Sequence, residues 1–141
     1  MSFDTLNQAK PNPNEKAIQM TQKTVLITSA TGRIGKELVA RLATVPNLTV
    51  RACYFSESKA DGLKALGADE VVKFDLSDPQ TWDAALDGVT AIYSASLDPM
   101  IEQHLAFCKA LGKRRDQINH VVRISWMGAD TNTASYDPNQ H

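Results

Sequence analysis

The sequence has 141 residues, 43% of them hydrophobic and 22% charged, with a formal net charge of -1, which is the length and composition of one globular domain with a sizeable core. Its two cysteines and the lack of a regular Cys/His spacing argue against a disulfide scaffold or a structural zinc module and suit a reducing compartment, so we expect a cytoplasmic protein without a metal site. No apolar run approaches the roughly 18 residues that a membrane helix needs, and the near-neutral charge argues against a nucleic-acid binder.

The N-terminal segment differs in composition from the rest of the chain. Residues 1–22 are polar, contain Pro11 and Pro13 and show no apolar period, so we predict a flexible arm there and a folded domain over 23–141. Beyond the arm, short apolar runs alternate with amphipathic stretches, which is the pattern of successive strand-helix units on a parallel sheet. We predict an α/β fold with five strands and four helices.

The first strand and helix of this fold are predicted over 24–29 and 33–43. The strand is a continuous apolar run, as expected for a central strand that is buried on both faces. The apolar residues of the helix share one face that can pack on the sheet, namely Ile34, Leu38, Val39 and Leu42.

The second strand is predicted over 48–55 and the third over 70–74. Between them we predict a helix over 59–66, with Ser58 capping its start and Gly67 providing its left-handed end. These strands extend the sheet on one side of the first strand.

A short helix begins after Asp78 and Pro79 and is expected to bury Trp82, and the fourth strand follows over 89–95. Asp98 and Pro99 start the last helix in the same way.

The last helix is predicted to pack through one apolar face, formed by Met100, Ile101, His104, Leu105, Cys108 and Leu111. His104 and Cys108 are four residues apart and could share a metal, but their place in this face favours core packing. The fifth strand is predicted over 120–126.

The segment from Ser29 to Gly35 carries the clearest functional signal, because it lies between the first strand and the first helix. Gly32 and Gly35 occupy the second and third positions of a G-x-x-G-x-x-G fingerprint, while Ser29 takes the place of the first glycine. Glycines here let the backbone approach a pyrophosphate, and the helix N-terminus favours the anion. The alternative is an ordinary strand-to-helix loop that uses glycine for packing. Ser29 fits either interpretation if its φ is negative and its hydroxyl bonds locally.

Three blocks extend this signal over residues 23–130: VLITSATGRIGKELVARL, VRACYFSESKADGLKALGADEVVKFDLSDPQTWDAALDGV and HVVRISWMGAD. They resemble the NmrA-like family, atypical short-chain dehydrogenase/reductases with a Rossmann fold. The resemblance implies a doubly wound parallel sheet in the order 3-2-1-4-5 and binding of NAD(P). Some members of the family reduce quinones, azo compounds or phenylpropanoid-type substrates, and others sense the nicotinamide redox state. Against this family the chain looks truncated just beyond its fifth strand, so we expect it to lack the C-terminal substrate-binding part.

The resemblance also implies which residues touch the cofactor. The pyrophosphate would lie against the glycine turn, the adenine after the third strand, and the ribose next to the nicotinamide after the fourth. In that order the residues are Ser29, Thr31, Gly32, Arg33, Ile34 and Gly35, then Asp75 and Leu76, then Ala95 and Ser96. The carboxylate of Asp75 can accept from the adenine amino group. Ser125 would lie at the mouth of the fifth strand.

The end of the second strand decides between NAD and NADP, because an acidic residue there bonds the 2′-hydroxyl and a basic one accommodates the 2′-phosphate. Phe55 stands where NADP-binding relatives have arginine. Ser56, Ser58 and Lys59, together with Arg33, could still satisfy a phosphate, so we favour NADP(H). Glu57 keeps NAD open.

The sequence does not identify a catalytic residue. Ordinary short-chain dehydrogenases use a Tyr-x-x-x-Lys pair, and none of the three tyrosines, Tyr54, Tyr93 and Tyr136, has a lysine four residues later. The main hypothesis is the NAD(P)-binding domain of an oxidoreductase that transfers hydride to a quinone-like or other small organic acceptor. The alternatives are a non-catalytic NAD(P) redox sensor or interaction module, and an incomplete chain that folds poorly.

In the order 3-2-1-4-5 the fifth strand lies at an edge, and its Arg123 tolerates that position. An exposed edge invites pairing with another chain. We therefore expect a homodimer, or a second polypeptide that covers this edge.

Overall fold

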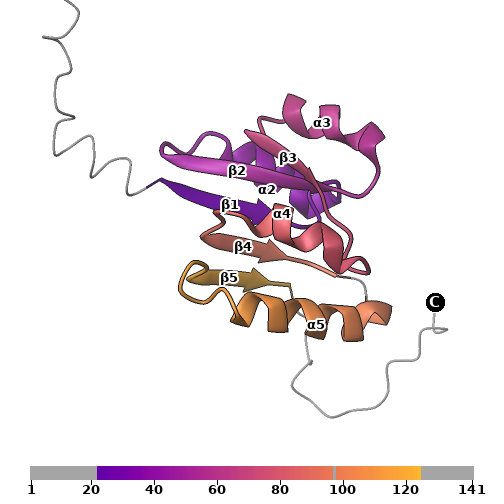
Figure 1. Ribbon diagram of the computed structural model, residues 1–141. Coiled ribbons are helices and arrows are strands. Elements are labelled where there is room, and N and C mark those ends of the chain that lie inside the picture. The colour runs from indigo at the N-terminus through magenta and orange to yellow at the C-terminus, as the bar shows by residue number, and fades with distance from the viewer. Residues whose placement is uncertain (1–21, 97, 125–141) are drawn as a thin grey trace, which may run out of the picture.

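A computed structural model describes residues 22–96 and 98–124 of the protein (Figure 1). Within these residues five parallel strands form one sheet in the order β3-β2-β1-β4-β5, which confirms the predicted order. The strands are β1 (Lys23–Ile27), β2 (Leu48–Tyr54), β3 (Glu70–Lys73), β4 (Ala91–Ser94) and β5 (His120–Arg123). The arm predicted over residues 1–22 lies outside the described residues, except for Gln22.

Helices follow the strands as predicted, α2 (Arg33–Leu42) after β1, α3 (Ala60–Ala65) after β2, α4 (Trp82–Leu86) after β3 and α5 (Ile101–Gly112) after β4. Single turns of 3₁₀ helix precede three of them, namely η2 (Glu57–Lys59), η3 (Pro79–Thr81) and η4 (Asp98–Met100). Each strand-helix-strand unit brings the chain back to the same edge of the sheet, so all the carboxyl ends of the strands lie on one side.

Strand β1 contributes to two hydrophobic cores, one on each face of the sheet. Val25 and Ile27 pack against α2 and α3, and Leu26 packs on the opposite face against α4 and α5. All three side chains are buried, which confirms the prediction that this strand is covered on both faces.

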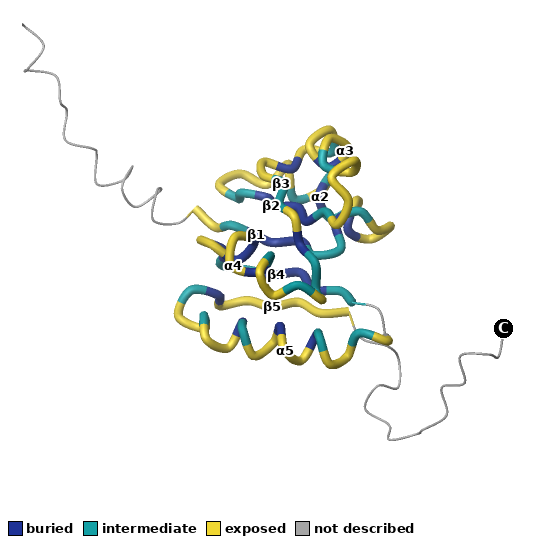
Figure 2. The backbone as a smooth tube through the Cα atoms, turned by 45° about the vertical axis from the view of Figure 1, so that its right-hand side comes forward, coloured by how far each residue is buried: buried dark blue, intermediate teal, exposed yellow. Residues whose placement is uncertain are grey.

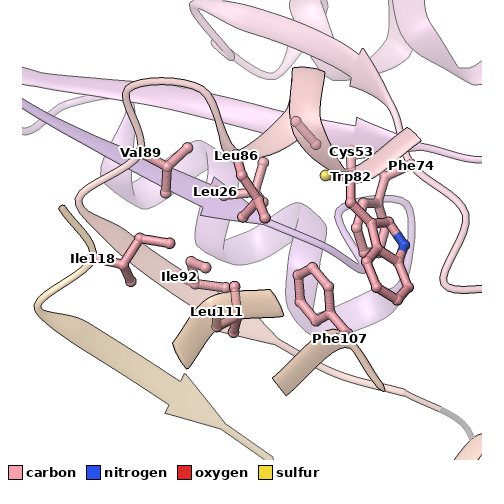
Figure 3. Packing of buried hydrophobic residues seen from close by; sticks show 11 residues of the cluster. Leu26, Cys53, Phe74, Trp82, Leu86, Val89, Ile92, Phe107, Leu111 and Ile118 are labelled. Atoms are coloured by element: carbon pink, nitrogen blue, oxygen red, sulfur yellow. The ribbon is translucent and has the colours of Figure 1, made fainter. Parts of the chain in front are cut away.

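Three aromatic rings form the centre of the core beneath α4 and α5 (Figure 3). Phe107 meets both Phe74 and Trp82 edge to face, with 5.2 Å between ring centroids in each pair. The indole N–H of Trp82 donates to the carbonyl of Asp75 at 3.0 Å. This confirms the predicted burial of Trp82, and it ties α4 to the loop that follows β3.

The packing face predicted for α5 is wrong in part. The helix buries His104 and Leu111 together with Phe107, which the sequence analysis did not single out. Ile101 is 61% exposed and Leu105 57%, and Cys108 is exposed as well. The reason is the large ring of Phe107, which fills the space between Phe74 and Trp82. That contact fixes the rotation of the helix and turns the face of Ile101, Leu105 and Cys108 away from the sheet.

A second correction concerns α2 and the start of α3. Val39 is fully buried and Leu38 and Leu42 pack against the same core, but Ile34 is 58% exposed. Gly35 and Val39 are the buried residues of α2, and Ile34 lies about 100° around the helix from Gly35, away from the sheet. Ser58 does not cap α3 either, because its hydroxyl pairs with that of Ser56 at 3.1 Å.

Two other predicted helix ends are confirmed. Gly67 ends α3 with a φ of +106°, a left-handed conformation that favours glycine. Asp78 caps the short η3 turn, since its carboxylate accepts from the backbone N–H of Gln80 at 3.1 Å.

Strand β5 forms the predicted edge of the sheet, and Figure 2 shows it exposed along its whole length. Among the described residues it pairs only with β4. Val121 and Val122 are each about half exposed. Residues 125 and 126, which the sequence analysis assigned to this strand, lie outside the described residues.

Within the described part of the chain, no helix is both long and apolar enough to cross a membrane. The same part contains no group of three or more histidine, cysteine, aspartate or glutamate side chains that could hold a metal ion. Of the two residues considered as a metal pair, His104 is buried and Cys108 is exposed.

The packing of α5 can be tested with two substitutions on the same helix. We expect Phe107→Ala to lower the free energy of unfolding by about 3–5 kcal/mol, because it leaves a cavity between Phe74 and Trp82. Leu105→Ala, at an exposed position, is expected to change it by less than about 0.5 kcal/mol. Urea denaturation of both variants measures the difference. A larger loss for Leu105→Ala would show that the helix packs through the face predicted from the sequence.

Candidate functional site

The turn between β1 and α2 brings backbone segments unusually close together. A Cβ atom on Gly35 would lie 2.7 Å from the Cα of Ala30, a distance that real Cβ atoms do not show. Glycine at this position therefore allows α2 to start directly on the turn. Gly32 is less crowded, since a Cβ there would lie 3.3 Å from the carbonyl oxygen of Ser29.

The first turn of α2 has backbone donors that are not used within the protein. Gly32, the N-cap residue, offers no side chain, and its N–H donates to the Ser29 carbonyl at 3.1 Å. Within the described residues, the N–H groups of Arg33, Ile34 and Gly35 have no acceptor. The first turn also has no acidic side chain. An uncapped helix N-terminus of this kind is suited to bind an anion.

Hydroxyl groups join the ends of β1 and β4, where the order of the sheet changes direction. Ser29 Oγ donates to the carbonyl of Ala95 at 3.0 Å, and the N–H of Ala95 donates to Thr28 Oγ1 at 3.2 Å. Among the described non-glycine residues only Asn47 has a positive φ. The expectation that Ser29 keeps a negative φ is therefore confirmed. The expectation that its hydroxyl bonds locally is wrong, because the hydroxyl reaches across the sheet to a residue 66 positions later.

A cavity of about 390 Å³ opens at the carboxyl ends of the strands, a volume typical of small-molecule sites. Six of the predicted cofactor-binding residues line it together: Ser29, Phe55, Asp75, Leu76, Ala95 and Ser96. Thr28, Phe74, Ser77 and Met100 complete the lining. The tertiary structure thus brings together residues that follow four different strands.

Asp75 is held rigidly in this cavity. Its carboxylate Oδ1 accepts from the N–H of Ser77 at 2.8 Å, and its own N–H donates to Thr81 Oγ1 at 3.0 Å. Its carbonyl accepts from Trp82, as described above. The cavity lining contains no lysine or arginine, so Asp75 is its one charged side chain.

A second cavity, of about 250 Å³, lies between the start of α2 and α3. Thr31 and Lys36 line it from the side of α2, and Ser58 and Lys59 line it from the side of α3. Gly62, Leu63 and Leu66 complete the lining. Two lysines and two residues with hydroxyl groups beside one small space, with no carboxylate among them, favour an anion. The sequence analysis missed Lys36, which lies one helical turn after Gly32 and so returns to the same side of α2.

The remaining predicted residues are placed less centrally. Arg33 and Ile34 line a separate hollow on the outer side of α2, and neither is among the residues that line the cavity of Lys59. Ser56 is exposed and lines neither of the two cavities. Ser125 and Tyr136 lie outside the described residues.

Three groups with shifted pKa values lie outside the lining of the larger cavity. Burial raises the pKa of the Cys53 thiol and that of the Tyr93 phenol, and both face the cores. Burial and the positive charge of Arg123 lower the pKa of His104, whose ring nitrogens have no partner among the described residues.

Comparisons with known proteins agree with this geometry. A protein-family model described as NAD(P)H-binding matches residues 29–140. Prestalk A differentiation protein A of Dictyostelium discoideum is 31% identical over 117 residues, which are 80% of this chain and 38% of that protein.

Two solved structures are similar as well. An NADPH-dependent quinone oxidoreductase of Escherichia coli matches with a TM-score of 0.58 and 29% identity over 76% of this chain and 36% of its own. A triphenylmethane reductase of Citrobacter sp., complexed with NADP(H), matches with a TM-score of 0.63 and 27% identity. The match covers 81% of this chain and 40% of the reductase. The chain thus spans less than half the length of each of these relatives.

Proposed function

The chain belongs to the NAD(P)H-binding family, and on that premise we propose that it is the cofactor-binding part of an NmrA-like oxidoreductase. When bound, the nicotinamide cofactor supplies a hydride to a small organic acceptor of the quinone class. The observation that carries the proposal is the first turn of α2. Three backbone N–H groups without described acceptors stand there at an uncapped helix N-terminus, directly after a turn that lines the cavity.

In the proposed complex, each part of the dinucleotide meets a group of matching chemistry. The pyrophosphate lies on the free N–H groups of residues 33–35, beside Thr31 and Gly32. The adenine lies at the Asp75 and Leu76 end of the cavity, and the ribose next to the nicotinamide lies at the Ala95 and Ser96 end. This places the dinucleotide across the point where the strand order reverses, the usual site in open α/β sheets.

The second cavity supports a preference for NADP(H). Lys36, Lys59, Thr31 and Ser58 are among the residues that line a space of about 250 Å³, which is large enough to hold a phosphate group. The larger cavity has no cation that could serve the same purpose. Glu57, exposed in the turn after β2, is the group that would favour NAD. We propose that the two lysines outweigh it.

The acceptor is inferred from the relatives. The E. coli protein is a quinone oxidoreductase and the Citrobacter protein a triphenylmethane reductase. Both kinds of acceptor are conjugated organic molecules. A conjugated organic acceptor at the Ala95 and Ser96 end of the cavity is therefore the substrate class that we propose.

The lack of a Tyr-x-x-x-Lys pair in the sequence favours a second function, that of a redox sensor. Such a sensor binds NADPH or NADP without turnover and passes its occupancy to a partner. The two functions require the same cofactor site, and they differ in whether an electron acceptor is consumed.

Both cysteines are free thiols, one buried and one exposed. An exposed thiol stays reduced more readily in a reducing compartment than in an oxidising one. Together with the proposed use of NADPH, this supports a cytoplasmic location.

We also propose that two copies of the chain pair through β5. Antiparallel pairing about Val122 places each Arg123 opposite a valine of the other copy, so that like charges do not face each other. This pairing is symmetric, as a two-fold dimer requires, and it covers valines that are half exposed in one copy. Arg123 therefore does not prevent self-association of the edge.

The cofactor proposal is tested by titration of the chain with NADPH and NADH, followed by nicotinamide fluorescence. We expect NADPH to bind at least about tenfold more tightly, and Lys36→Ala and Lys59→Ala each to remove about tenfold of that affinity without affecting NADH. Lys64→Ala, an exposed lysine of α3 outside the cavity, is the matched control. Binding of neither cofactor at millimolar concentration would refute the function, and tenfold tighter binding of NADH would refute the preference.

Turnover separates the two functions. With NADPH and a panel of quinones and triphenylmethane dyes, the oxidoreductase hypothesis expects sustained loss of absorbance at the wavelength of the reduced nicotinamide. Tight NADPH binding together with no turnover for any acceptor of the panel would instead support the sensor.

Dimerisation is tested by light scattering of the wild-type chain at micromolar concentration, where we expect a dimer. Val122→Lys is expected to give a monomer, because it places two ammonium groups opposite each other at the centre of the pairing. Val45→Lys, which also adds a charge at an exposed valine but lies before β2, should leave the dimer intact. A wild-type monomer would contradict the proposal.

A further inference from the structure

Phe55 is the most exposed large apolar side chain in the described part of the molecule. It directly follows β2 and is 69% exposed, although the residues just before it in the strand are buried or half-buried. Single exposed hydrophobic residues are common on protein surfaces. Phe55 differs from them because it lines the larger cavity, opposite the loop of Asp75 and Leu76.

The backbone holds Phe55 firmly in that place. The N–H of Phe74 donates to the carbonyl of Tyr54 at 2.9 Å, so the residue before Phe55 is fixed against the end of β3. The residue after it is fixed as well, because the Ser56 carbonyl accepts from the N–H of Lys59 at 3.0 Å. A ligand that uses the ring therefore loses little backbone freedom on binding.

The chemistry around the ring points to a flat, uncharged heterocycle with an amino group. Phe55 and Leu76 line the cavity, together with the mostly buried Phe74 and, as its one charged residue, Asp75. One oxygen of that carboxylate already accepts from Ser77, which fixes its orientation. An anion would be repelled here, whereas a base with an exocyclic amine is matched on both its face and its edge.

We propose that Phe55 stacks on the adenine ring of the dinucleotide and is a binding residue that selects for this base. The inference rests on the proposed function and deepens it. It also divides the recognition of the cofactor between two places. Phe55 and Asp75 recognise the base in the larger cavity, and Lys36 and Lys59 recognise the phosphate in the smaller one. An aromatic residue at the end of β2 is then compatible with NADP(H), because the cations lie elsewhere.

Two fragments of the cofactor, one with adenine and one without it, distinguish stacking of Phe55 on adenine from a general loss of cofactor binding. Calorimetric titration with AMP should give an affinity about tenfold lower for Phe55→Ala than for the wild type, because loss of one stacking platform costs on the order of 1–3 kcal/mol. Binding of nicotinamide mononucleotide, which lacks adenine, should not change. Phe55→Tyr should retain AMP affinity, and Phe55→Leu, which keeps an apolar side chain but no π-face, should lose it.

A spectroscopic variant adds a direct readout. In Phe55→Trp the new indole should be quenched as AMP is added, beyond the change in the wild type, whose own signal comes from Trp82 and Trp126. Val45→Ala, another exposed apolar position but outside the cavity, serves as the control for AMP affinity. Because Phe55 is mostly exposed, its variants should unfold at the wild-type temperature.

The outcomes separate this inference from the function on which it rests. If the wild type binds neither NADPH, NADH nor AMP, the proposed function fails and the stacking role with it. If the wild type binds these ligands and Phe55→Ala binds AMP equally well, only the stacking role is overturned. A change in oligomeric state of Phe55→Ala with unchanged AMP affinity would likewise overturn it, and would assign the ring to a protein contact.

Discussion

The close approach of α2 to the end of β1 is the constraint on which the rest of the candidate site depends. Gly35 permits it, because any Cβ at this position would collide with the backbone of Ala30. The contact places the uncapped first turn of α2 at the carboxyl edge of the sheet, where its N–H groups can meet a phosphate. A helix that started one turn later would leave these donors away from the cavity.

The packing of the sheet determines what surrounds that turn. β1 is covered on both faces, so it must be central, and the hydroxyls of Thr28 and Ser29 join its end to β4. On one face the rings of Phe74, Trp82 and Phe107 hold α4 and the loop of Asp75 in place (Figure 3). The same apolar contacts that stabilise the fold therefore position a carboxylate in the cavity, which links the stability of the domain to recognition of the ligand.

Charge is distributed unevenly over the candidate site. The larger cavity has one carboxylate and no cation, whereas the smaller has two lysines and no carboxylate. Separating the groups in this way lets one protein bind a neutral base and an anionic phosphate of one ligand without either set of side chains repelling its own target. The helix N-terminus between them accommodates the remaining anionic group.

The sequence by itself determined the strands and the glycine turn, because hydrophobic period and turn chemistry are local properties. The order of the strands followed from the resemblance to a family, and the sheet confirms it. It also indicated the residues at the strand ends that line the larger cavity. Only the tertiary structure decided the rotation of α5 about Phe107, the exposure of Ile34 and the placement of Lys36 beside Lys59. Helical periodicity alone is consistent with more than one buried face, because several apolar residues lie at a suitable spacing. Which of them is buried depends on the shape of the partner surface, and that surface is built from residues distant in the sequence.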